Sequence, residues 1–80
     1  MQYLATFYTH FAALSFHRRL RERGVPGRMM PAPRKVSVSC GSCVTFETEG
    51  DFHALLVEDT EAVYHISKGQ YAAVYRHEDT

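Results

Sequence analysis

Hydrophobic and polar positions in the first third of the chain follow two different periods. Residues 2–8 are aromatic-rich, mostly apolar and free of Gly and Pro, which predicts a first strand. Over residues 10–23 the apolar positions instead recur at helical spacing, which predicts a helix that Thr9 can cap and Gly24 ends. The residues that carry this spacing are Ala13, Phe16 and Leu20, with Ala12 beside them.

Two strands with a long polar loop between them are predicted next. Residues 28–32 form the second strand, and Pro31 limits it to a sheet edge or a strand end because proline has no backbone N–H to donate. A polar loop follows over residues 33–42. Residues 44–49 then alternate between apolar and polar, as a half-buried third strand should.

A second helix and a fourth strand complete the predicted unit. Asp51 can cap a short helix that continues to residue 57, and residues 62–66 are predicted to form the fourth strand. The element order β-α-β-β-α-β predicts an α+β fold. Its architecture would be a ferredoxin-like sandwich, with two helices on one face of a four-stranded antiparallel sheet.

The end of the chain lies outside this unit. The sequence therefore divides into a domain over residues 1–67 and a C-terminal extension over residues 68–80. Residues 70–76 fit an added edge strand, a dimerisation arm or a frayed end, and the pattern does not choose among these three. A dimerisation arm would make the protein a homodimer, paired through sheet edges.

Length and composition limit the kind of function to expect. A chain of 80 residues forms one small domain that buries roughly 60 to 65% of its unfolded surface, so a deep enclosed active site is not expected. The 45% hydrophobic and 22% charged content is typical of a globular protein. No apolar stretch approaches the roughly 20 residues that span a bilayer, and residues 1–13 lack a signal-peptide pattern. We therefore expect a cytoplasmic protein without a membrane partner.

Charge is distributed unevenly although the formal net charge is zero. Residues 1–40 hold seven Lys and Arg against one acidic residue, whereas residues 41–80 hold two against eight. This asymmetry could produce a basic face suited to an anionic ligand, or the two halves could pack together and neutralise each other's charge. We favour the second interpretation. The arginines near the end of the predicted helix are Arg18, Arg19, Arg21 and Arg23. Such a cluster suits the negative end of the helix dipole, so no nucleic acid is expected as a partner.

The only two cysteines, Cys40 and Cys43, stand in one loop with the order Cys-Gly-Ser-Cys. Thiols at this spacing can close a disulfide, share a metal, or act as a nucleophile with a resolving thiol, and the spacing alone does not choose among these. In a reducing cytoplasm, a reactive or metal-binding pair is favoured over a permanent disulfide.

Several neighbours could stabilise a thiolate or a persulfide at Cys40. Cations and backbone amides that point at sulfur lower its pKa, and hydroxyl groups can donate hydrogen bonds to it. The groups that the sequence supplies are Arg34, Lys35, Ser39, Gly41 and Ser42. The alternative is that Cys40 is a small apolar residue tucked under the loop.

A metal site is not predicted within one chain, and we expect no cofactor. Structural zinc takes four ligands, and a second Cys or His pair at short spacing is missing. The five histidines are scattered, at His10, His17, His53, His65 and His77. A dimer could supply two cysteines from each chain, and this alternative stays open.

Two short motifs follow the aromatic strand at residues 2–8 and the helix that ends at Gly24. They are Met-x-Pro-x-Pro-Arg at residues 29–34 and Val-Ser-Val-Ser-Cys-Gly at residues 36–41. Over residues 2–67 this succession resembles the small bacterial family named "putative selenium/sulfur carrier protein-like". The resemblance implies that Cys40 carries sulfur or selenium, as a persulfide or a selenenyl sulfide, between donor and acceptor proteins. The family position of Cys43 is usually apolar, so this thiol is a departure that could resolve the loaded atom by forming a disulfide with Cys40.

The sequence therefore predicts a carrier or accessory protein rather than a turnover enzyme. Motifs typical of hydrolases, kinases and nucleotide-binding proteins are missing from the chain. The competing hypothesis is a non-enzymatic interaction or regulatory module, whose cysteine pair is structural or binds metal across a dimer.

Overall fold

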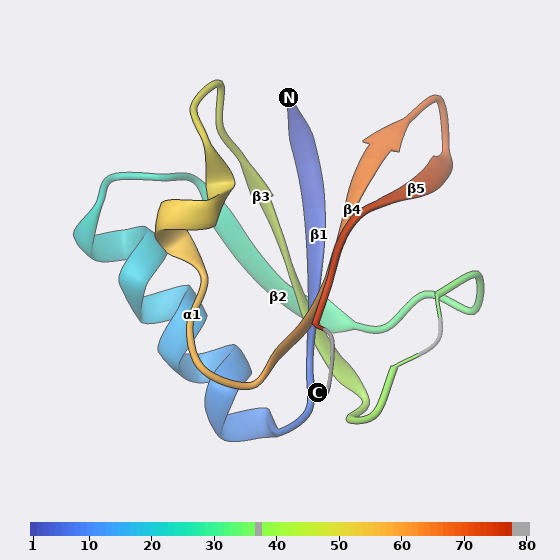
Figure 1. The fold of residues 1–80 in the computed structure, drawn as a ribbon, viewed down its shortest axis with the longest axis horizontal. Helices are drawn as coiled ribbons and strands as arrows, with labels where there is room; N and C mark the ends of the chain where they lie inside the picture. Colours follow the sequence, from blue (N-terminus) through green and yellow to red (C-terminus); the bar gives the residue numbers. More distant parts are fainter. Residues whose placement is uncertain (37, 78–80) are drawn as a thin grey trace.

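The structure is a computed structural model that describes residues 1–36 and 38–77, and over these residues it is a five-stranded sheet with a helix on one face (Figure 1). The helical elements are the α-helix α1 (His10–Glu22) and the 3₁₀ helix η1 (Phe52–Leu55). The strands are β1 (Gln2–Phe7), β2 (Gly27–Pro31), β3 (Ser42–Glu47), β4 (Thr60–Ser67) and β5 (Gln70–Arg76). Neighbouring strands are antiparallel in the order β2-β3-β1-β4-β5, so β1 is central.

The fold class is α+β, but the predicted ferredoxin-like sandwich with four strands and two helices is wrong. The expected second helix is reduced to the four residues of η1, and Leu56 after it is already extended, with ψ of 142°. Asp51 caps this segment as predicted, because its carboxylate accepts a hydrogen bond from the His53 N–H at 3.0 Å. The Thr60 hydroxyl then binds both the N–H and the carbonyl of Val57, at 3.2 and 2.7 Å, and these bonds replace the ones that a longer helix would form.

Helix α1 forms as its pattern predicts. The Thr9 hydroxyl accepts a hydrogen bond from the Ala12 N–H at 3.0 Å, and the chain leaves the helix at Gly24 with φ of +70°. The buried side chains are Ala12, Ala13, Phe16 and Leu20, and they face the sheet. Within the part of the chain that the structure describes, no helix has the length and apolar composition needed to cross a membrane.

Each face of the sheet has its own hydrophobic cluster, because successive side chains of a strand point to opposite faces. On the helix side, Phe7, Phe46 and Val63 pack with the buried residues of α1. The cluster on the second face consists of Leu4, Val36, Cys43, Ala62 and Tyr64, with Ala32 and Val38 packed against it. The segment between β2 and β3, predicted as a polar loop, therefore also covers part of the second face.

Strand β5 is the added edge strand, which was one of the three alternatives for residues 70–76. It pairs with β4 from Ser67 opposite Gln70 to Ala62 opposite Arg76. The turn between the two strands places Lys68 and Gly69 at φ of +52° and +76°, as a two-residue type I′ hairpin requires. The side chains of Tyr75 and Tyr71 pack against the helix-side and second-face clusters, respectively.

Gly27 marks a close approach between α1 and β2. A Cβ atom at this position would clash with Leu20 Cδ1 and would lie 3.4 Å from the Thr45 carbonyl oxygen. We expect Gly27→Ala to lower the free energy of unfolding by about 1 kcal/mol, because Leu20 must leave its packed rotamer. Urea denaturation measures this change, and Gly50→Ala is the control because the nearest atom to its Cβ would be 3.8 Å away. Equal stability of the two variants would contradict the close approach.

Candidate functional site

The two cysteines lie at the same end of β3 but on opposite sides of the sheet. Cys43 belongs to β3 and is fully buried in the second-face cluster. Cys40 lies in the bend before β3, is partly buried, and packs against the helix-side cluster. Both are free thiols. The two thiols pack in different hydrophobic clusters, and Cys43, unlike Cys40, is held within the β2–β3 pairing, opposite Met30.

Cys43 is in a setting that keeps its thiol protonated. Burial, and to a smaller extent repulsion from a Cys40 thiolate, raises the pKa of the Cys43 thiol to about 11. Its Sγ lies 3.6 Å from the carbonyl oxygen of Met30 and 3.8 Å from that of Pro31, and both oxygens can accept a hydrogen bond from the protonated thiol. Near neutral pH, roughly one molecule in ten thousand would hold Cys43 as a thiolate. In the folded protein Cys43 is therefore a core residue.

The loop that holds Cys40 is anchored on both sides of this residue. The Cys40 thiol donates to the Ser42 carbonyl oxygen at 3.5 Å. Before it, Ser39 donates its N–H and its hydroxyl to the Glu61 carboxylate, at 3.2 and 2.8 Å. After it, the Ser42 hydroxyl lies 3.2 Å from His10 Nδ1. These contacts tie the loop to the start of β4 on one side and to the start of α1 on the other.

The sequence pattern did not identify His10 or Glu61 as part of this site. Both come from distant segments, and the strand order brings them to Cys40. Thr6, near the end of β1, is paired with Cys43 of β3 and with Ala62 of β4. The start of α1, the start of β3 and the start of β4 therefore lie at the same end of the sheet (Figure 1). A correct prediction of the strand order would have placed both residues near Cys40.

A comparison with protein families adds to this geometry. The family model described as "Putative Se/S carrier protein-like" matches residues 2–75. The chain belongs to this family. The match confirms the resemblance in the sequence and extends beyond residue 67 to take in most of β5. No curated protein and no solved structure matches.

The two cations predicted at the site of this Se/S carrier-like protein lie in the loop after β2. Lys35 Nζ donates to the Gly69 carbonyl oxygen at 3.3 Å. Gly69 is in the β4–β5 turn, at the opposite end of β4 from Glu61, so the ammonium group of Lys35 lies away from Cys40. Arg34 is exposed in the turn that precedes Lys35.

The other three predicted groups are sequence neighbours of Cys40, and they determine the shape of its loop. Ser39 binds Glu61, and the Ser42 hydroxyl contacts His10, as described above. The Gly41 carbonyl oxygen accepts a hydrogen bond from the Ala32 N–H at 3.1 Å, which joins the two ends of the long loop. The fold therefore brings Ser39, Gly41 and Ser42 to Cys40 and directs Lys35 elsewhere.

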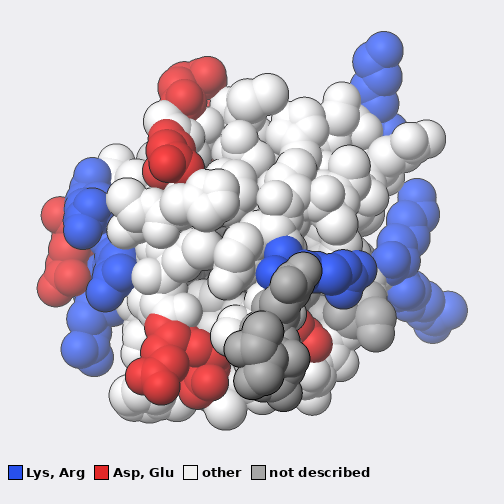
Figure 2. Space-filling model, viewed as in Figure 1, with Lys and Arg blue, Asp and Glu red and all other residues white. Residues whose placement is uncertain are grey.

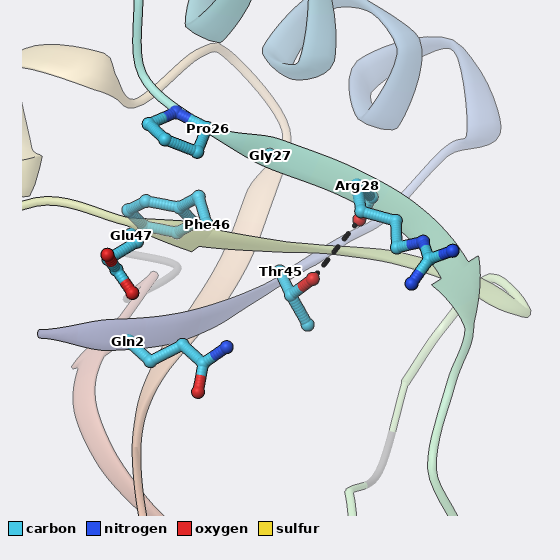
Figure 3. A pocket seen from close by; sticks show the side chains of 7 residues that line it. All are labelled: Gln2, Pro26, Gly27, Arg28, Thr45, Phe46 and Glu47. Carbon is cyan, nitrogen blue, oxygen red and sulfur yellow. Dashed lines mark hydrogen bonds between the residues drawn. The ribbon is translucent and has the colours of Figure 1, made fainter.

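A shallow cavity of about 350 Å³ lies at the other end of β3 (Figure 3). Its lining residues are Gln2, Pro26, Gly27, Arg28, Thr45, Phe46 and Glu47. The Thr45 hydroxyl donates to the Arg28 carbonyl oxygen at 3.4 Å across β2 and β3. None of the residues of the Cys40 loop lines this cavity, so it is separate from the candidate site.

Two other histidines, His53 and His65, have partners outside the Cys40 loop. His53 Nδ1 lies 2.7 Å from the Asp51 carboxylate, and the His65 ring packs against Tyr3 at a centroid distance of 5.6 Å. Over residues 1–36 and 38–77, no group of three or more His, Cys, Asp or Glu side chains is placed to hold a metal ion.

The Glu61 anchor leads to a prediction about the reactivity of Cys40. We expect Glu61→Gln to increase the rate of Cys40 alkylation in the folded protein roughly fivefold, because the loop loses about 1 kcal/mol of hydrogen-bond stabilisation. Iodoacetamide labelling followed by mass spectrometry measures the rate. Glu58→Gln is the control, since Glu58 is an exposed carboxylate in the turn just before β4. Equal rates in both variants would mean that the contact between Ser39 and Glu61 does not hold the loop.

Proposed function

We propose that this protein carries a sulfur or selenium atom on Cys40, held as a persulfide or a selenenyl sulfide. The observation that supports this most directly is the contrast between the two thiols. Cys40 is partly exposed in a loop at the end of the sheet, whereas Cys43 is buried with its pKa raised to about 11. Membership of the Se/S carrier-like family supports the same assignment. In the folded protein, Cys40 is the thiol that a donor can reach.

Loading is an exchange reaction without net oxidation. The Cys40 thiolate attacks the outer sulfur of a donor persulfide, so a new bond forms to Cys40 Sγ while the S–S bond of the donor breaks. The donor leaves as a thiolate and takes up the proton that Cys40 released. An acceptor thiolate then attacks the terminal atom in the same way, and Cys40 leaves as the thiolate. A terminal selenium atom follows the same steps.

The two anchors give the loop a role in this exchange. A thiol on a free loop would meet the donor in many orientations, which slows an in-line attack on sulfur. Glu61 and His10 hold the residues on either side of Cys40, at Ser39 and Ser42. The backbone that presents Cys40 is thereby fixed before a donor arrives.

Release of the atom to an acceptor, rather than to Cys43, fits the placement of the two thiols. Resolution by Cys43 would form a disulfide with Cys40 and release hydrosulfide. That step requires Cys43 to leave the second-face cluster or Cys40 to leave the helix-side cluster, and it requires a buried thiol with a pKa of about 11 to ionise. We therefore assign Cys43 to the core and the release step to an acceptor protein.

Loading of the reduced protein by a cysteine desulfurase with cysteine tests the proposed function. Intact mass spectrometry is expected to show the gain of one sulfur atom, and fragmentation spectra are expected to place it on Cys40 rather than Cys43. A parallel sample with glutathione persulfide removes the need for protein recognition. An unmodified Cys40 with both donors would eliminate the carrier function.

A further inference from the structure

The outer face of α1 carries apolar side chains that the fold leaves in water. Five large hydrophobic residues are exposed among those that the structure describes; two of them lie in the first turns of α1, and a third precedes the helix. They are Tyr8, Phe11 and Leu14, which are 38%, 78% and 48% exposed. A helix of this kind normally has polar residues opposite its buried stripe. A grouped set of exposed apolar residues is typical of an interaction surface.

The same face continues into a basic surface. Arg18 lies one helical turn after Leu14, and Arg21 follows it; both are exposed. Figure 2 shows blue side chains gathered over α1 at one edge of the molecule, with acidic atoms beside them. We define the α1 docking face as Phe11, Leu14, Arg18 and Arg21.

The arginines of this face form no direct ion pairs with the acidic residues that the structure describes. Over residues 1–36 and 38–77, the ion pairs are those of the Met1 amino group with Glu49 and of His53 with Asp51. Among these described residues, the neutralisation expected between the basic and acidic halves is therefore not made by direct ion pairs with the arginines of α1. Arg19, outside the docking face, donates to the Leu56 carbonyl oxygen at 2.9 Å. A partner with carboxylates would supply the complementary charge.

The docking face begins beside the candidate site. His10, which precedes Phe11, contacts the Ser42 hydroxyl at 3.2 Å, and the Ser42 carbonyl accepts from the Cys40 thiol at 3.5 Å. A protein that lies along the outer face of α1 would have one end next to Cys40. Its own reactive sulfur would reach Cys40 from there.

We propose that the α1 docking face binds the protein that donates the persulfide, through an apolar contact bordered by carboxylates. This inference rests on the proposed function of Cys40. The exposed Phe11 and Leu14 would provide the buried centre of the interface, and Arg18 and Arg21 would steer the encounter and make it salt-dependent. A nucleic acid fits less well, because the exposed Phe11 and Leu14 have no role in contacting phosphate.

The test compares two donors for Cys40: a persulfide-bearing cysteine desulfurase and glutathione persulfide, which needs no docking. For Leu14→Ser and for Arg18→Glu, we expect the ratio of the loading rate from the desulfurase to that from glutathione persulfide to fall about tenfold, through a higher KM. Val74→Ser is the matched apolar control, because Val74 is 45% exposed on β5. Arg28→Glu is the charge control on β2.

The outcomes separate this inference from the proposed function. An unchanged ratio in the α1 variants, or an equal fall in the Val74→Ser control, would overturn the docking face while leaving carriage on Cys40 intact. Loading of the unaltered protein by glutathione persulfide but not by the desulfurase would likewise overturn the docking face and leave carriage on Cys40 intact. If neither donor loads Cys40, fluorescence anisotropy with the desulfurase free of persulfide still tests the docking face. Binding of the desulfurase to the unaltered protein that is lost in Leu14→Ser supports the docking face, and absence of binding to the unaltered protein overturns it. A fluorescent RNA oligonucleotide whose binding is lost with Arg18→Glu but not with Leu14→Ser would also overturn it, in favour of a nucleic-acid surface.

Discussion

Replacing Cys40 with serine is expected to abolish the transfer of sulfur or selenium to this protein and to slow thiol alkylation of the folded chain by at least about a hundredfold. The thiol that remains, Cys43, is buried, and its pKa is raised from 9.0 to about 11. This shift alone lowers the thiolate fraction about a hundredfold near neutral pH. Iodoacetamide labelling with intact mass spectrometry, in buffer and in denaturant, measures the loss.

Cys43→Ala is the matched variant for this prediction. It removes the other thiol and leaves Cys40, Ser42 and the Glu61 anchor in place. We expect it to accept the atom on Cys40 at close to the unaltered rate, provided that circular dichroism shows it folded. A folded Cys43→Ala protein that no longer loads would show that both thiols take part, and the assignment of Cys43 to the core would then be wrong.

Raising the pH toward 11 is expected to reduce the free energy of unfolding by up to about 2 kcal/mol through Cys43 alone. The pKa of this thiol in the folded state, about 11, is above its usual value of 9.0. The folded state therefore binds the proton more tightly than the unfolded state does. This contribution is complete below pH 9.0 and is lost as the pH rises through about 11.

Urea denaturation at a series of pH values measures this loss. Tyrosine and lysine side chains also titrate in this range, so the unaltered protein has to be compared with Cys43→Ala, which retains all of them. The stability difference between the two proteins should shift against the unaltered protein between pH 9.0 and about 11. Parallel curves would show that Cys43 is not desolvated in the folded state.

Helix α1 and the segment after Asp51 show why one helix could be predicted and the other could not. In α1, four buried positions over three turns, the Thr9 cap and the terminal Gly24 all indicate the same helix. After Asp51, the buried residues are Phe52 and Leu55, and a spacing of three fits a 3₁₀ turn as well as an α-helix. The deciding contacts come from the Thr60 hydroxyl, and hydrophobic periodicity does not record side-chain bonds to the backbone.

The sequence could propose Cys40 as the centre of a candidate site, but it could not show which distant residues contact its loop. Cys40 follows from the loop motif and the family resemblance, because both are properties of adjacent residues. The anchors His10 and Glu61 could not be found in this way, because the antiparallel pairing of β1 with β3 and β4 brings them to the loop. Lys35 shows the opposite case. It is close to Cys40 in sequence, but the loop crosses the sheet and carries its side chain to Gly69.

The placement of Cys40 and Cys43 on opposite sides of β3 gives each sulfur atom a different experimental signal. A thiol reagent added to the native protein alkylates Cys40 as the free thiol or as the persulfide, and the mass of the product shows whether the carried atom is present. The same reagent added in denaturant counts both sulfur atoms, and the increment measures the chains that were intact and folded at the start. Occupancy and folding can thus be followed in one sample with one reagent and no added label.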